Sequence, residues 1–318
     1  MTKHIFIVNP AAGKGIEARP LTDKIRDGCE VSGVDFTVYQ TTRRGDATEY
    51  VRRLAARKPH EDEYRFYACG GDGTLSEVIN GVVDEGRRGP LPGIHVGCVP
   101  IGTGNDFVRN FKQYEFFSDI TKQLLGDPIV IDCFALNDRY GINMFNVGFD
   151  CDVVCKAAEL KKQPLMPKRL AYVVGVALVL IKNAGKIISV HRADGSEITR
   201  EFELCAVANG GFCGGGFYSA PESRLDDGLL DISLIKKVSR STFLALVGSY
   251  KKGTHLGTRL GKKVVAYSKE RSIAFRFSED TAVSIDGEIE TVREAVFRSV
   301  PGSVSFVLPV GVEYPPAV

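Results

Sequence analysis

The chain has 318 residues, which is long enough for two domains at the usual ~100–200 residues per domain. Hydrophobic residues make up 44% and charged residues 25%, as in an ordinary globular protein. The 41 basic residues are nearly balanced by 39 acidic ones, which argues against a nucleic-acid-binding protein.

The eight cysteines are scattered, and several lie in apolar segments. Cys151 and Cys155 are four residues apart, but no second cysteine or histidine pair completes a zinc site. We therefore expect structural thiols in a reducing compartment. The first residues run directly into a strand pattern without a signal peptide, which predicts a cytoplasmic protein.

The first part of the chain alternates strand and helix patterns. Alternation of this kind predicts a parallel sheet covered by helices, which is a doubly wound α/β domain over residues 1–128. Its loops, described below, make it the candidate nucleotide-binding domain. The expected strands are 4–8, 35–40, 65–69 and 95–99, and the expected helices are 17–31, 46–57, 74–83 and a short one from Asn105.

From about residue 129 the sequence pattern changes to runs of β-branched residues separated by turns. This pattern predicts a C-terminal antiparallel β-sandwich domain over residues 129–318. About the last 20 residues could instead pack back on the first domain. The expected strands are 129–136, 139–148, 186–192, 199–209, 230–235, 263–268, 272–277, 282–285 and 294–299, and the expected helices are 152–160, 169–183 and 241–251.

Each of the first four predicted strands ends in a glycine-rich or polar loop. In a parallel sheet such loops meet at one edge and form a pocket. The most informative loop is Gly70-Gly71-Asp72-Gly73-Thr74, with Thr74 as the expected helix N-cap. Glycines let backbone N–H groups approach an anion, and the helix N-terminus adds its positive end, so this loop predicts polyphosphate binding.

Two other nucleotide-binding patterns fit less well. Gly13-Lys14-Gly15 begins a match to the dinucleotide fingerprint, but the second strand lacks the acidic residue that holds a ribose, which argues against a dehydrogenase. A Walker A motif is excluded because Gly15 follows Lys14 where a Ser or Thr is needed.

The loop motifs taken together resemble the diacylglycerol kinase catalytic-domain family, in particular the soluble bacterial lipid kinases related to sphingosine and ceramide kinases. The resemblance covers essentially the whole chain. It rests on the loop from Asn9 to Gly15, the Gly70–Thr74 loop, Gly102-Thr103-Gly104-Asn105-Asp106-Phe107 and Asp286-Gly287-Glu288. It implies ATP-dependent phosphorylation of a lipid hydroxyl between a phosphofructokinase- or NAD-kinase-like domain and a β-rich domain.

The glycine turn can hold the ATP phosphates through its amides, and Asp72 can bind Mg²⁺ beside them. The resemblance makes Asp286 the general base, with Glu288 as its partner, although an isolated Asp-Gly is more often a hairpin turn. The predicted nucleotide contacts are Asn9, Lys14, Thr41, Gly70, Gly71, Asp72, Gly73, Thr74, Glu77, Gly102, Thr103, Gly104 and Asn105.

The acidic segment 221–231 reads as a solvated loop from its composition alone. The resemblance implies a structural Mg²⁺ there, bound by the Asp227 carboxylate and the main-chain carbonyls of Arg224 and Leu229.

We expect diacylglycerol as the acceptor and a peripheral membrane surface as a partner. The apolar run 170–181 is too short to span a bilayer, and its length favours a buried helix. The alternative is a helix that touches the membrane surface, which is supported by Lys161, Lys162, Lys168 and Arg169 just upstream. Another lipid alcohol (a sphingoid base, monoacylglycerol or phosphatidylglycerol), an NAD kinase and a non-catalytic lipid or nucleotide sensor remain as alternatives. A strand edge of either domain could form a homodimer.

Overall fold

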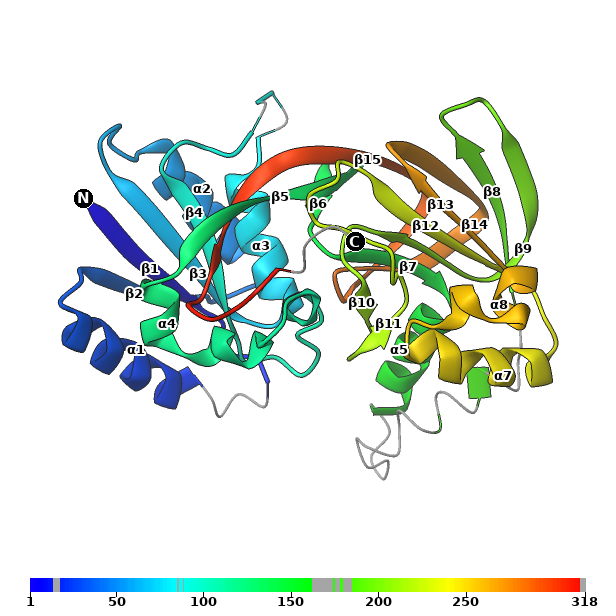
Figure 1. Cartoon of the computed structure of the whole chain (residues 1–318), viewed down its shortest axis with the longest axis horizontal. Coiled ribbons are helices and arrows are strands. Elements are labelled where there is room, and N and C mark those ends of the chain that lie inside the picture. Colours follow the sequence, from blue (N-terminus) through cyan, green and yellow to red (C-terminus); the bar gives the residue numbers. More distant parts are fainter. Residues whose placement is uncertain are drawn as a thin grey trace.

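The computed structural model describes residues 1–13, 18–84, 86–87, 89–161, 174, 178–179 and 185–314. Two lobes lie side by side, and one long strand runs through both (Figure 1). The first lobe combines helices with parallel strands, and the second consists mainly of antiparallel strands. This arrangement confirms the predicted fold class.

Parallel strands in the order β2–β1–β3–β4 form the sheet of the first lobe. Helices cover both faces: Phe6 and Val8 pack with α1 and α4, whereas Ile5 and Ile7 pack with α2 and α3. This explains why β1 is apolar along its length. The elements are β1 (Thr2–Val8), α1 (Ala18–Ser32), β2 (Phe36–Gln40), α2 (Asp46–Ala56), β3 (Glu63–Gly70), α3 (Asp72–Val82), β4 (Ile94–Pro100), the 3₁₀ turns η1 (Phe107–Asn110) and η2 (Tyr114–Ser118), and α4 (Ile120–Leu124).

The second lobe is built around an aromatic core. The rings of Phe145, Phe275 and Phe297 pack edge to face, with centroids 4.7 to 6.1 Å apart. The elements are β5 (Asp127–Leu136), β6 (Arg139–Gly141), β7 (Met144–Gly148), α5 (Phe149–Lys161), β8 (Lys186–Arg192), β9 (Glu197–Ala208), β10 (Phe212–Cys213), β11 (Phe217–Tyr218), β12 (Leu230–Lys236), α7 (Arg240–Lys251), η3 (His255–Gly257), α8 (Arg259–Val264), β13 (Val265–Glu270), β14 (Ser272–Ile285) and β15 (Glu288–Leu308).

Several predicted elements differ from the observed ones. Residues 263–264 end α8 instead of beginning a strand, and the helix expected from Asn105 is only the short η1 turn. The strands expected at 272–277 and 282–285 are parts of β14, because the exposed residues 278–280 lie at a shift in its register with β15, which is a bulge rather than a turn. The helix expected at 169–183 lies mostly outside the described residues.

Strand β15 joins the two lobes. It pairs with β14 and β5 in the second lobe, and farther along Phe306 lies opposite Val96 of β4 in the first (Figure 1). The Phe306 ring packs against Phe107 and Phe111, and Phe111 also contacts Tyr314. The end of the described chain therefore packs on the first lobe. Among the described residues, no helix has the length and apolar character needed to cross a bilayer.

Candidate active site

A cavity of about 1180 Å³ lies between the lobes. Its wall in the first lobe comes from the loops after the four parallel strands, and its wall in the second lobe includes Asn143, Ser284 and Asp286. The predicted nucleotide-contact residues that line it are Asn9, Thr41, Gly71, Asp72, Gly73, Thr74, Glu77, Gly102, Thr103 and Gly104.

Gly70 and Asn105 do not line the cavity, contrary to expectation. The Gly70 carbonyl accepts hydrogen bonds from the amides of Ile101 (2.9 Å) and Gly102 (3.2 Å). The Asn105 side chain donates to the Gly102 carbonyl at 2.8 Å. Both residues therefore shape the glycine loops from behind. Lys14 lies outside the described residues.

Helix α3 begins one turn earlier than predicted. Its N-cap is Gly71, and Thr74 lies inside the helix, so the expectation that Thr74 caps it is wrong. The Thr74 hydroxyl instead accepts a hydrogen bond from the Asn9 side-chain amide at 3.0 Å. This contact joins the loop after β1 to the first turn of α3. Gly71 and Gly73 still line the cavity at the N-terminus of α3, which is the kind of position that anion binding requires.

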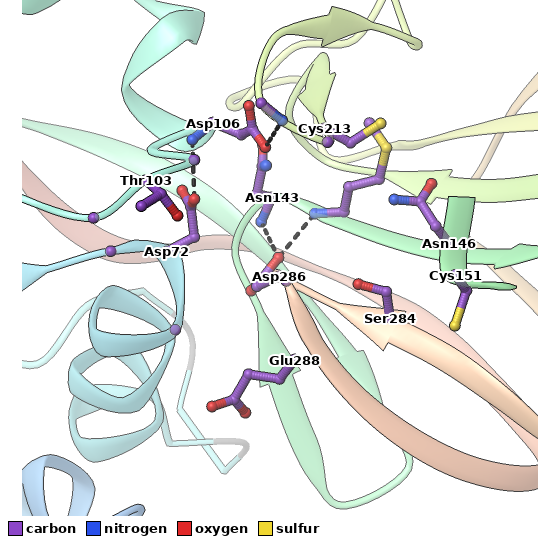
Figure 2. A pocket seen from close by; sticks show the side chains of 18 of the residues that line it. Asp72, Thr103, Asp106, Asn143, Asn146, Cys151, Cys213, Ser284, Asp286 and Glu288 are labelled. Atoms are coloured by element: carbon purple, nitrogen blue, oxygen red, sulfur yellow. Dashed lines mark hydrogen bonds between the residues drawn. The ribbon is translucent and has the colours of Figure 1, made fainter. Parts of the chain in front are cut away.

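Asp72 joins two of the loops. Its carboxylate oxygens accept hydrogen bonds from the backbone amides of Asp106 and Phe107, both at 3.0 Å. Figure 2 shows Asp72 beside Thr103 and Asp106 on the first-lobe side of the cavity. An oxygen that accepts one such bond keeps a second lone pair, so Asp72 can still bind a Mg²⁺ ion or its water ligands.

Glu77 holds the N-terminus of the neighbouring helix. Its two carboxylate oxygens accept hydrogen bonds from the amides of Gly45 (2.8 Å) and Ala47 (3.2 Å) at the start of α2. A carboxylate at a helix N-terminus is favourable because of the helix dipole. Glu77 thereby positions the Thr41–Gly45 loop, of which Thr41 faces the cavity.

Asp286 is both a hairpin residue and a buried carboxylate. It lies in the turn between β14 and β15 with φ 47°, and its side chain is almost fully buried. Its oxygens accept hydrogen bonds from the amides of Ile142 (2.8 Å), Asn143 (3.0 Å) and Met144 (2.8 Å). Burial raises its pKa to about 6, although the three amides act in the opposite direction. Such a group can take up a proton near neutral pH.

The described structure has no hydrogen bond from Glu288 to the Asp286 carboxylate, which is held by the three amides, so nothing in it supports the expected pairing of the two residues. The Glu288 carboxylate instead pairs with Arg44, at 2.9 Å, and with Arg139. Arg44 belongs to the first lobe and Arg139 to β6 of the second, so Glu288 links the lobes at the cavity. Glu290 pairs with the same two arginines.

Two contacts had no clear sequence signal. Asp106 accepts a hydrogen bond from the Gly215 amide at 2.9 Å and so holds the β10–β11 turn of the second lobe beside the first. Burial raises the pKa of Asp106. Asn110 accepts one from the Gly211 amide at 2.7 Å. Their partners lie about a hundred residues away in the chain, which local patterns do not reveal.

The second-lobe end of the cavity is apolar. In Figure 2, Asp286 lies between the Asp72 side and a region with Asn146, Cys151 and Cys213. Beyond it the lining includes Phe149, Leu204, Phe217, Phe243, Leu246 and Tyr250. The same cavity therefore offers amides and carboxylates at one end and hydrocarbon and aromatic surface at the other.

The acidic turn does not fit a metal ion. Asp227 accepts a hydrogen bond from the Leu229 amide at 3.0 Å and another from the Lys269 ammonium at 2.8 Å, and Arg224 pairs with Asp226. In the described part of the chain, no group of three or more His, Cys, Asp or Glu residues could hold a metal ion. A cation is present at Asp227, but it is a lysine.

Comparisons with known proteins agree with this architecture. Residues 3–135 match the model described as diacylglycerol kinase catalytic domain, and residues 144–308 match the one described as YegS C-terminal NAD kinase beta sandwich-like domain. The chain is 26% identical to a diacylglycerol kinase of Bacillus subtilis, over 97% of each chain. It is 28% identical to one of Staphylococcus saprophyticus, over 89% of this chain and 88% of the relative.

Solved structures share the fold. A crystal structure of a diacylglycerol kinase from Bacillus anthracis strain Sterne is 22% identical, covers 97% of both chains and gives a TM-score of 0.66. A second structure from the same strain is 24% identical over 97% of both chains, with a TM-score of 0.72. The two lobes and the matched models define a protein of the lipid kinase type. The chain belongs to the diacylglycerol kinase catalytic-domain family, which confirms the family inferred from the motifs.

Proposed function

We propose that this protein transfers the γ-phosphate of ATP to the hydroxyl of diacylglycerol and so forms phosphatidic acid. One observation carries the proposal: a single cavity joins the glycine-rich turns to an apolar chamber, and Asp286 is among its lining residues. Its volume of about 1180 Å³ exceeds the ~300–1,000 Å³ of most small-molecule sites, so a nucleotide and part of a lipid can share it.

The nucleotide belongs at the first-lobe end in this proposal. Gly71, Gly73 and the N-terminus of α3 receive the phosphates, while Thr41 and Thr103 line the space beside them. Mg²⁺ bound with ATP neutralises phosphate charge. Asp72 supplies an oxygen ligand to that ion or its waters. Arg44 and Arg139 pair with Glu288 and so neutralise its negative charge, which would otherwise repel the phosphates.

The acceptor hydroxyl belongs beside Asp286. Its oxygen attacks the γ-phosphorus, the bond from that phosphorus to the β–γ bridging oxygen breaks, and ADP leaves with the electron pair. The hydroxyl proton passes to the Asp286 carboxylate, which is ionised above its pKa of about 6. The three amides on this carboxylate fix its position: Oδ1 accepts two of these hydrogen bonds and Oδ2 accepts one, so Oδ2 keeps a lone pair for another hydrogen bond.

The apolar chamber favours a lipid over NAD as the acceptor. NAD carries a charged pyrophosphate and two riboses, and burying these groups against Phe149, Phe243 and Leu246 without partners is unfavourable. Acyl chains lose water and gain contacts there. Sphingoid bases, monoacylglycerol and phosphatidylglycerol also carry acyl or alkyl chains, so they remain alternatives of the same class.

One assay separates these acceptors. Purified protein is given ATP labelled at the γ-phosphate with mixed micelles of diacylglycerol, the three alternative lipids, or NAD in solution. We expect labelled phosphatidic acid in excess over every other product. Labelled NADP would instead support an NAD kinase. If ATP binds but no acceptor is labelled, the protein is a sensor and the proposed reaction is wrong.

We further propose that the chamber opens toward an anionic membrane surface. The side chains of the basic residues first considered for this role, Lys161, Lys162, Lys168 and Arg169, lie outside the described part of the structure. The described chain offers α7 and α8 instead: residues 240–264, which span both helices, hold six Lys or Arg and no Asp or Glu. Leu244 of α7 is 57% exposed, and both it and Lys251 line the cavity. Cations around an apolar opening suit a surface of acidic lipids.

A further inference from the structure

The acidic turn between β11 and β12 (residues 219–229) and the start of β12 concentrate negative charge. Glu222, Asp226, Asp227 and Asp231 lie within ten residues of one another, and Asp231 is fully buried. Buried carboxylates are costly unless cations or hydrogen bonds compensate them. The turn therefore needs a positive partner.

Lys269 of β13 supplies that partner. It lies opposite Asp231 in the antiparallel pair of β12 and β13. Its ammonium donates to the Asp227 carboxylate at 2.8 Å, to the Glu222 carbonyl at 2.8 Å and to the Asp231 carboxylate at 3.3 Å. An ammonium has three N–H donors, and here each has one oxygen from a different residue.

The same oxygens are the kind that a hard divalent cation would take: two carboxylates and a main-chain carbonyl. A metal ion among them would lie at ~2.0–2.6 Å from each oxygen, in the space that the lysine nitrogen fills. The second oxygen of Asp231 is satisfied separately, by the Tyr267 hydroxyl at 2.7 Å. Burial works to lower the pKa of Lys269, but its bond to Asp227 and the two carboxylate charges outweigh this and raise it.

The turn that Lys269 holds is a junction between the lobes. The Leu225 amide donates to the Tyr314 hydroxyl at 2.6 Å, and the Leu225 carbonyl accepts from the Asp132 amide at 2.6 Å. The Asp132 carboxylate in turn accepts from the Gly228 amide at 2.7 Å. Since Tyr314 packs on Phe111 of the first lobe, the turn connects β5, β12 and the aromatic cluster.

We propose that the Lys269 ammonium takes the place of a divalent metal ion in this turn: it compensates the charge of the same carboxylates, so the second lobe needs no metal to fold. The requirement of catalysis for a metal ion is therefore separate from that of folding stability. Mg²⁺ serves phosphoryl transfer in the proposed reaction, whereas the stability of the lobes does not depend on it. The inference about Lys269 stands on the turn itself and does not require the proposed reaction.

The test uses thermal unfolding of the full chain without nucleotide. Wild type should show the same Tm in EDTA, in Mg²⁺ and in Ca²⁺. Lys269→Met should lower the Tm in EDTA by about 5–10 °C, because two carboxylates lose their cation. Added Mg²⁺ or Ca²⁺ should then raise the Tm of this variant along a saturable curve, and calorimetric titration should show a site that wild type lacks.

A matched control comes from a second buried ion pair. Lys237 pairs with Glu203 at 2.8 Å, and Glu203 is 3% exposed. Lys237→Met should also lower the Tm, but it should gain no response to divalent ions. Lys269→Arg keeps a cation and should remain insensitive to metal.

Three results would overturn the proposal. The first is a wild-type Tm that falls in EDTA, because the turn would then already hold a metal. The second is a Lys269→Met protein that responds no more to divalent ions than Lys237→Met does. If Lys269→Met does not fold in EDTA, it should be refolded with Ca²⁺, and failure to fold there as well is the third.

Discussion

A Cβ placed on Gly102 would lie 2.5 Å from the Cα of Gly71, so the two glycine-rich turns pack backbone against backbone. A side chain on either glycine should therefore disturb the phosphate site from two loops at once.

Gly71→Val and Gly102→Ala should both lower ATP affinity by at least about tenfold, because the turns must separate. Equilibrium ATP binding measures the effect. Gly248→Ala is the matched control, since a Cβ there meets no atom within 4 Å. It should bind ATP normally. Normal ATP binding by Gly71→Val would mean that the phosphates bind elsewhere.

Asp286→Asn should lower kcat by about 10²-fold or more, since the proton acceptor is lost. The structure predicts a second effect of this change, on the stability of the turn. An amide has one acceptor oxygen, so its NH₂ group would face the N–H of either Ile142 or the Asn143–Met144 pair. We expect a loss of about 1–3 kcal/mol in the free energy of unfolding.

Activity of Asp286→Asn must therefore be measured at a temperature where the variant remains folded. ATP affinity, measured on the same sample, should barely change because the nucleotide turns belong to the other lobe. A folded variant that keeps most of its kcat would remove Asp286 from catalysis.

The pH dependence of kcat should follow the same carboxylate. Burial raises the Asp286 pKa to about 6, and only the ionised form accepts a proton. The kcat should therefore be constant above this value and fall about tenfold per pH unit below it. The residual kcat of Asp286→Asn should not show this fall at low pH. A wild-type kcat that is unchanged down to pH 5 would contradict the assignment.

His255 should make the protein sensitive to acid. It is fully buried, neither ring nitrogen has a hydrogen-bond partner among the described residues, and burial lowers its pKa to about 4. The pKa of His255 in the folded protein lies below its unfolded value of about 6.5. Neutral His255 therefore contributes fully to the free energy of unfolding above pH 6.5, and this contribution is lost as the pH falls toward 4. The loss is on the order of 2–3 kcal/mol.

Denaturant unfolding at pH 7 and pH 4.5 measures this sensitivity. His255→Phe should show a smaller difference between the two pH values than wild type. Part of the difference that remains in this variant should come from His4, because burial also lowers the pKa of His4 to about 4. Equal pH sensitivity in the variant and wild type would mean that His255 does not titrate in this range.

Vesicle binding tests the proposed membrane surface. Replacing Lys251 and Lys252 with Gln should reduce the affinity for acidic vesicles, measured by sedimentation, by about thirtyfold at ~1 kcal/mol per charge, and more at low than at high salt. The control pair is Lys24→Gln with Arg26→Gln on α1, in the other lobe (Figure 1). Equal loss in both pairs would indicate general charge attraction and no particular surface.

Local patterns were sufficient to predict the first lobe and its pocket. Each parallel strand ends in a loop with a recognisable composition, and sheet topology brings those ends together. Thus the loops of Asn9, Thr41, Asp72 and Thr103 could be placed at one edge before the structure was known.

Contacts between distant segments could not be predicted in the same way. Asp286 looked like an ordinary turn residue because its three amide partners precede it by more than 140 residues. Lys269 is set opposite Asp231 by the register of β12 and β13, and that register is not visible in either strand alone. The second-lobe loops that complete the cavity depend on such pairings.

Strand β15 also sets the order in which this protein can fold. Its Phe306 completes the aromatic cluster of the first lobe, although nearly two hundred residues separate it from Phe111. The first lobe therefore emerges from the ribosome without part of its own core, and that core cannot be completed until the second lobe has been synthesised. Long-range closure of this kind is slow and leaves apolar surface exposed meanwhile. Residues 1–128 expressed alone should thus behave as an incompletely folded, aggregation-prone chain, although they hold every predicted nucleotide contact.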